Sequence, residues 1–254
     1  MTEKKTKEQA AWKPSAENKS KATRLRIFAA LSWVAAIAAQ MGAIYYISHV
    51  KPIAMWIPIV IMVVDAAFAI TGGMLWKKSN HIDPPSEKNK FLFYIQSQLG
   101  LIVAIIAFLP LIIFIFTSKD LDKKQKGILG SIAVVLLVAT GLVSTDWNPV
   151  SAEQYAAQTD MIEILADGND VYGTKSGEKY HIYEDCQYLK NSTEVTKGSV
   201  IDLHEKNSHI LGTPEALCST CKKKAMKAKG LDDAALDKAM LDRLTERESE
   251  GTDK

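Results

Sequence analysis

The chain has 254 residues and a formal net charge of +2. The charge is unevenly placed: residues 1–26 hold eight Lys/Arg against three Glu, whereas residues 145–254 hold 14 Lys/Arg against 21 Asp/Glu. An acidic C-terminal region opposes general nucleic-acid binding, and three cysteines, an odd number, argue against a disulfide framework.

Residues 1–24 form the first segment and are predicted to be a flexible basic arm. It is rich in Lys, Glu, Ala and Ser. Such an arm either sets the membrane topology as a solvated tail or contacts anionic lipid, and the solvated tail is the favoured interpretation.

Four long apolar stretches follow within residues 25–145. A helix needs about 20 mainly apolar residues to cross a bilayer, and each stretch meets this length with at most one charge. The first is longer than the apolar core of a signal peptide and lacks a cleavage site. We therefore expect an all-α bundle of four transmembrane helices, at about 27–50, 52–76, 91–118 and 127–145.

The distribution of Lys and Arg predicts the orientation of the spans. With the N-terminus inside, twelve basic residues of the arm and short loops lie inside and five outside. The loop Lys119–Lys126, with four lysines, opposes this assignment. We expect a multi-pass protein of the cell membrane with both termini cytoplasmic.

Polar side chains inside the spans are few. Asp65 lies at the middle of the second span, and Gln40 lies at similar depth in the first. Gln96 and Gln98 lie in the inner part of the third. Because polar groups in hydrocarbon hydrogen-bond between helices, they are predicted to join the bundle, and the alternative is a proton or cation site at Asp65.

Residues 146–254 have the composition of a soluble α+β domain. Ser151 and Gln154 form a capping-box pattern that opens a helix ending near Ala166. Segments 171–173 and 179–183 are predicted to form a hairpin, and Thr213-Pro214 to begin a helix. Apolar residues at helical spacing predict an amphipathic tail helix at 231–248.

One constellation carries recognisable chemistry. His181 and Cys186 are followed, after 31 residues, by the pair Cys218 and Cys221. Zinc prefers thiolate and imidazole ligands, and Cys-x2-Cys places two thiolates on one tight turn. The spacing predicts a structural Zn²⁺ site within residues 170–229. Free cysteines and a redox-active Cys218/Cys221 pair are the alternatives.

Further short motifs surround these four residues: Val171-Tyr172, Ser176-Gly177, Tyr180-His181, Cys186 with Tyr188-Leu189, and Cys218-x-x-Cys221. With them the segment resembles a small zinc-binding module that ends many bacterial membrane and surface proteins, and it is similar to the metal-binding head of Ada-type DNA repair methyltransferases. The resemblance implies that the four residues named above are the ligands. The segment departs from the family before the final Cys pair, where Leu217 stands in place of the usual proline. The Ada-type head has four cysteines, so methyl transfer is not expected here.

Other polar residues of the domain are assigned to its surface. Glu184 and Asp185, beside the site, are expected to be exposed loop charges, and His204 and His209 to be surface residues. The lysines at 222–224, 227 and 229 are predicted to form a solvated basic face rather than a phosphate-binding one.

The sequence therefore predicts a membrane bundle that anchors a zinc-stabilised interaction module, and no enzyme. The expected partners are the bilayer and a protein bound by the C-terminal domain, with homo-oligomerisation left open and nucleic acid not expected. The alternative is a small ion or solute transporter or channel with the zinc module as a regulatory cap.

Overall fold

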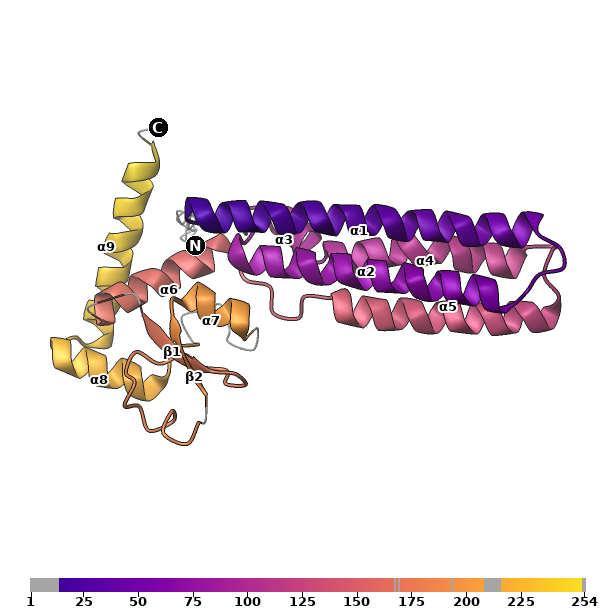
Figure 1. Ribbon diagram of the computed structural model, residues 1–254. Helices are drawn as coiled ribbons and strands as arrows, with labels where there is room; N and C mark the ends of the chain where they lie inside the picture. The colour runs from indigo at the N-terminus through magenta and orange to yellow at the C-terminus, as the bar shows by residue number, and fades with distance from the viewer. Residues whose placement is uncertain (1–13, 167, 169, 193, 208–215, 253–254) are drawn as a thin grey trace, which may run out of the picture. The chain divides into compact units, whose positions relative to one another are not determined.

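A computed structural model describes residues 14–166, 168, 170–192, 194–207 and 216–252. They form two compact units, one of residues 16–80 and 94–147, the other including residues 81–93 and 148–252 (Figure 1). The helices are α1 Ala16–His49, α2 Trp56–Ile82, α3 Lys90–Ser97, α4 Leu99–Thr117, α5 Lys123–Ser144, α6 Ala152–Leu165, α7 Val200–Lys206, α8 Ser219–Lys229 and α9 Asp233–Thr252. The strands are β1 Val171–Thr174 and β2 Val195–Gly198.

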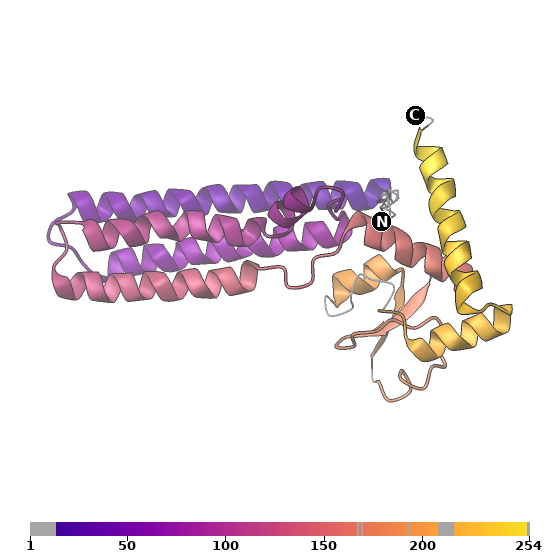
Figure 2. The ribbon, with the colours of Figure 1, turned by 180° about the vertical axis from the view of Figure 1, so that it is seen from behind.

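Four of these helices, α1, α2, α4 and α5, are long and apolar enough to cross a membrane. They lie side by side in one bundle (Figure 2), which confirms the four predicted apolar helices. The predicted third span, 91–118, contains two helices instead of one. The chain breaks at Gln98, between the short α3 and the longer α4.

The inner face of α1 follows a seven-residue repeat. Ala22, Ala29, Ala36 and Ala43 are all fully buried, and larger buried residues lie between them along the same face. Small residues at this spacing let neighbouring helices approach closely. The opposite faces of the bundle expose many Ile, Val, Leu and Phe side chains, as expected of a surface that contacts lipid.

Glycines mark the closest helix contacts. A Cβ placed on Gly72 would lie 2.4 Å from the Trp33 ring, and one on Gly73 would lie 2.4 Å from Ser144 Oγ. A Cβ on Gly100 would lie 2.9 Å from the Ser144 carbonyl. The C-terminal ends of α2 and α5 and the N-terminal end of α4 therefore meet at a point that has no room for a further side chain.

The C-terminal unit is organised around α6, which packs against α7, α8 and α9. Its capping box is present as predicted: Ser151 Oγ accepts from the Gln154 N–H, and the Gln154 side chain accepts from the Ser151 N–H. The tail helix is also present, as α9. Leu236 on α9 is buried in the core of the unit.

The sheet differs from the predicted hairpin. β1 pairs antiparallel with β2 along its whole length, with Val171 opposite Gly198. The predicted second strand, 179–183, contributes only isolated bridges, from His181 to Tyr172 and from Tyr180 to Leu217. The chain leaves β1 after His181 because the next residues turn into the loop that carries Cys186.

The loop between α2 and α3 belongs to the C-terminal unit. The Ala152 N–H donates to the Pro85 carbonyl (3.1 Å), and Tyr155 Oη donates to the His81 carbonyl (3.1 Å). The buried Glu153 accepts hydrogen bonds from Ser86 Oγ and from the Glu87 N–H (2.9 Å). These contacts require the α2–α3 loop and the C-terminal domain to lie on the same side of a membrane.

Candidate metal centre

His181, Cys186, Cys218 and Cys221 converge at one point of the C-terminal unit. One ligand atom from each lies within 4.8 Å of all the others. His181 Nδ1 lies 3.2 Å from Cys186 Sγ and 3.8 Å from Cys221 Sγ. Two pairs that are far apart in the chain therefore meet as the spacing predicted.

Backbone pairing brings the two halves of the site together. The Tyr180 N–H donates to the Ala216 carbonyl and the Cys218 N–H to the Tyr180 carbonyl, both at 2.9 Å. Because His181 follows Tyr180 directly, this bridge sets its ring beside Cys218. Cys221 lies in the first turn of α8, where the Lys222 N–H bonds back to the Cys218 carbonyl.

All four side chains are buried: His181 is 6% exposed, Cys186 7%, Cys218 4% and Cys221 1%. The three cysteines form part of the apolar core of the unit, together with Tyr180, Leu217 and other residues. The site is therefore a structural element of this core and not a surface feature.

Burial changes the pKa of two of the four side chains. It is the largest of the causes that raise the pKa of the Cys221 thiol to about 12; Cys186 and Cys218 also raise this pKa, and the backbone amides of Tyr183 and Ile182 lower it. Burial lowers the pKa of His181, which favours the neutral imidazole that can act as a ligand. A metal ion would displace the proton of each thiol that it binds, because the thiolate is the ligand.

The geometry fits one tetrahedral ion. Bonds of about 2.3 Å to sulfur and about 2.0 Å to nitrogen place the ligand atoms of a tetrahedral shell about 3.5–3.8 Å apart, and the four ligand atoms here lie within 4.8 Å of one another. The four protein ligands would fill a tetrahedral shell and leave no position for water or substrate. The group can hold a metal ion, and the donor set is that of a closed site.

Charged neighbours surround the site at the surface. Lys224 Nζ pairs with Asp185 (3.1 Å) and lies 4.2 Å from the centre of the Tyr183 ring. Glu184 and Asp185 are exposed, as predicted. A cavity of about 130 Å³ opens here, lined by Cys186 and Cys221 together with Tyr183, Asp185, Gln187, Thr220 and Lys224.

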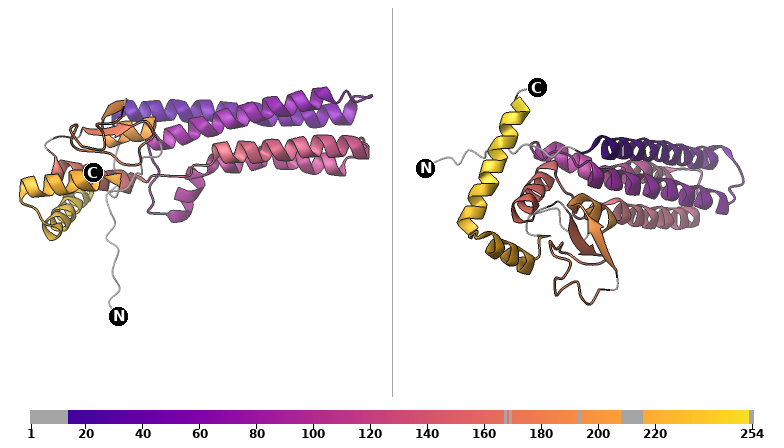
Figure 3. Two further views of the ribbon diagram at one scale, coloured as in Figure 1. Left: turned by 90° about the horizontal axis from the view of Figure 1, so that it is seen from below. Right: turned by 60° about the vertical axis from the view of Figure 1, so that its left-hand side comes forward.

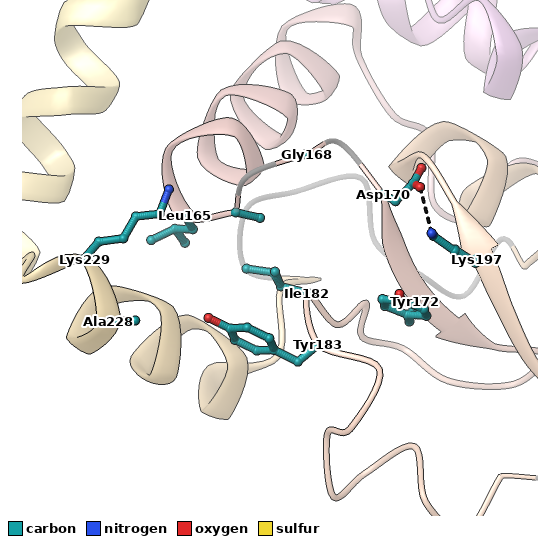
Figure 4. A pocket seen from close by; sticks show the side chains of 10 residues that line it. Leu165, Gly168, Asp170, Tyr172, Ile182, Tyr183, Lys197, Ala228 and Lys229 are labelled. Atoms are coloured by element: carbon teal, nitrogen blue, oxygen red, sulfur yellow. Dashed lines mark ion pairs between the residues drawn. The ribbon is translucent and has the colours of Figure 1, made fainter.

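A larger cavity, of about 420 Å³, lies beside the site but touches none of its four ligands. Its walls come from the end of α6, β1, β2 and the end of α8 (Figure 4). An ion pair of 3.1 Å between Lys197 and Asp170 lies on one side, and this pair raises the pKa of Lys197. The cavity is therefore a separate feature, flanked by charges that already have partners.

One histidine was assigned wrongly. His204, predicted at the surface, is fully buried. Its ring lies 4.5 Å from the ring of His81 and 6.0 Å from that of Tyr155. His209 and the predicted helix start at Thr213-Pro214 lie outside the described residues. The burial of His204 depends on α2 and α6, which no local sequence signal near residue 204 reveals.

The polar residues of the spans fall into two groups. Gln98 joins the α3–α4 break to the end of α5: its amide donates to the Asp146 carbonyl (2.8 Å) and its oxygen accepts from the Asp146 N–H (3.3 Å). The Gln96 side chain is exposed, and its backbone carbonyl accepts hydrogen bonds instead. Asp65 and Gln40 are buried, and neither carboxylate oxygen of Asp65 has a hydrogen-bond partner among the described residues.

In comparisons with known proteins, no family model, no curated protein and no solved structure matches the chain.

Proposed function

We propose that this chain is a multi-pass membrane protein whose helical bundle anchors a zinc-stabilised protein-interaction domain. The observation that carries the proposal is the convergence of four buried ligands inside the core of the C-terminal unit. Three thiolates and one imidazole suit zinc, and a closed shell stabilises a fold without supplying a reactive position. The protein is accordingly not a zinc hydrolase.

The surface of the domain supports a protein partner over nucleic acid. Residues 145–254 carry 14 basic and 21 acidic residues, and this charge opposes a polyanion. The excess of Lys and Arg in the N-terminal arm and in residues 77–90 supports a cytoplasmic location for both termini. The sequence resembles a bacterial zinc-binding module with the same ligand pattern, and this resemblance supports zinc as the bound metal.

Metal removal tests the structural role of zinc. The protein is reconstituted in vesicles with the C-terminal unit exposed, treated with a strong chelator and digested briefly with protease. We expect new cleavage between residues 170 and 229, while the membrane helices stay protected. Cys218→Ser should behave like the chelated protein, and Ser219→Ala, at the exposed neighbouring position, like the untreated one. A chelated domain that resists protease as well as before would contradict the proposal.

A transporter is the second candidate, and Asp65 favours it. A fully buried carboxylate that finds no hydrogen-bond partner among the described residues is costly inside a bundle. Gln40 lies nine residues before the end of α1 and Asp65 nine residues after the start of α2. Because a short connection joins these helices, the two side chains lie at the same depth, about 14 Å from it along the axis.

Proton flux separates the two functions. Vesicles that contain the protein are loaded with a pH-sensitive dye and given a pH gradient. A transporter predicts collapse of the gradient that Asp65→Asn abolishes and that Asp120→Asn, a change at an exposed loop carboxylate, leaves unchanged. Gradients equal to those of empty vesicles would exclude proton transport and leave the anchoring function.

A further inference from the structure

The third membrane crossing needs only α4. With 19 residues, this helix is about 28 Å long, which matches the apolar thickness of a bilayer of about 30 Å. If α3 continued the same span, it would add about 12 Å. The chain therefore has an additional helix of eight residues at the start of a crossing that is already long enough.

α3 exposes an apolar surface. Phe91 is 71% exposed, Leu92 51% and Tyr94 60%. At 100° per residue, these three and Ile95 occupy a continuous arc of about 160° on one helix. The residues on the other side, Phe93 and Ser97, are half-buried and buried. A short helix with such a surface needs an apolar neighbour.

Markers of the membrane surface lie at the end of α3. Trp76 donates its indole N–H to the Gln96 carbonyl (2.8 Å), and the Asn80 amide donates to the same oxygen (2.9 Å). Indole rings prefer the headgroup region. From Trp56 to Trp76, α2 spans about 30 Å, so these two tryptophans mark the two edges of one bilayer. The end of α3 therefore lies at the inner edge.

The local structure makes α3 a separate helix. Asn89 Oδ1 accepts from the N–H groups of Phe91 and Leu92, both at 3.1 Å, and so caps its first turn. At its other end the helix breaks at Gln98, whose side chain bonds to Asp146. Because of the break, the Gln96 carbonyl accepts hydrogen bonds from the Trp76 indole and the Asn80 amide instead of from a helical N–H.

We propose that α3 lies in the membrane–water interface as a lipid-binding helix, with Phe91, Leu92 and Tyr94 inserted at the boundary between headgroups and acyl chains. The exposed Lys88 and Lys90 beside this arc favour anionic headgroups. The occupant of the arc is lipid, because α3 is joined through Gln98 to α4 (Figure 3), whose Ile, Leu and Phe side chains are exposed as in a lipid-facing helix. This inference goes beyond the proposed function and does not depend on zinc.

Nitroxide depth measurements test the proposal in the full chain. Single cysteines replace Phe91 and Tyr94, and the labelled protein is reconstituted in vesicles of phosphatidylcholine with a minor fraction of phosphatidylglycerol. Accessibility to oxygen and to a water-soluble nickel chelate gives the depth of each label. Leu109→Cys, on the exposed face of α4, and Lys124→Cys, at an exposed position in the first turn of α5, supply the membrane and water references. The unsubstituted chain, whose three cysteines are buried, gives the background labelling.

The two labels are about 4.5 Å apart along the helix axis. An interfacial α3 predicts equal depths for both, about 5–10 Å inside the headgroups, with high oxygen accessibility. A label at 91 that lies in water and further out than the label at 94 would overturn the proposal, because α3 would then extend the span. Shielding of both labels from oxygen and nickel, with spin–spin broadening, would also overturn it and assign the arc to a second copy of the chain.

Discussion

Cys221 is the candidate ligand whose thiol is most strongly affected by burial. Its thiol is almost fully buried, and burial raises its pKa to about 12. In the metal-free fold this thiol is neutral at pH 7, and its contribution to stability is lost only as pH rises toward that value. A bound cation would reverse this preference for the neutral thiol, because the thiolate then becomes the stable form.

Metal binding should therefore release protons. A thiol must lose its proton to bind zinc, whereas burial lowers the pKa of His181 and favours the neutral imidazole, which has no proton to lose at its ligand nitrogen. We expect about three protons to leave for each zinc ion bound, and the affinity to fall steeply as the pH is lowered. Titration with zinc in weak buffers of different ionisation enthalpy measures this number. Release of one proton or fewer would mean that the thiols do not all bind the metal.

Gly73, on α2, tests the close packing of the bundle. Its Cβ would meet Ser144 Oγ at 2.4 Å, so Gly73→Ala should force α2 and α5 apart and destabilise the bundle by about 1–3 kcal/mol. Gly42→Ala is the matched control, because nothing lies within 4 Å of its added methyl group. Thermal aggregation in detergent compares the variants. Equal midpoints would contradict the packing.

The α2–α3 loop should contribute to the stability of the C-terminal domain. Ser86→Ala removes one hydrogen-bond donor from the buried Glu153 carboxylate. We expect a loss of about 1–3 kcal/mol, because a buried charged acceptor is left with one fewer donor. Ser176→Ala, in an exposed turn, should change stability by less than about 0.5 kcal/mol. Urea unfolding followed by circular dichroism measures both variants.

Elements with a strong local pattern could be predicted from the sequence. The apolar helices, the α6 capping box and the tail helix follow from periodicity and capping alone. The break at Gln98 could not be predicted, because residues 91–118 contain no charge and the break depends on side chains of α2 and on Asp146. β2 and α7 were missed because each is short, and β2 contains Lys197 and Gly198, which are poor strand formers.

The candidate metal site could be located because metal ligation limits the spacing of its residues. The Cys-x2-Cys pattern together with His181 and Cys186 predicted the group that the structure brings together, with free cysteines and a redox pair as the alternatives. What holds them, the pairing of Tyr180 with Leu217, joins segments far apart in the sequence and has no local signature. The same reason explains why the burial of His204 was missed.

At the scale of the whole molecule, the chain passes between its two units within α2, within α3 and after α5. α2 ends inside the C-terminal unit, where the His81 ring lies 4.5 Å from the His204 ring and the His81 carbonyl accepts from Tyr155 Oη. A soluble fragment that begins near residue 150 would lack residues 81–93 of this unit, so the full chain is the right material for experiments.

X-ray absorption at the zinc edge of the full-length protein, purified in detergent, tests the central claim most directly. The account predicts one tetrahedral site with three sulfur ligands at about 2.3 Å and one imidazole nitrogen at about 2.0 Å. A zinc shell with fewer than three sulfurs, or one that contains a water oxygen, would contradict a closed structural site.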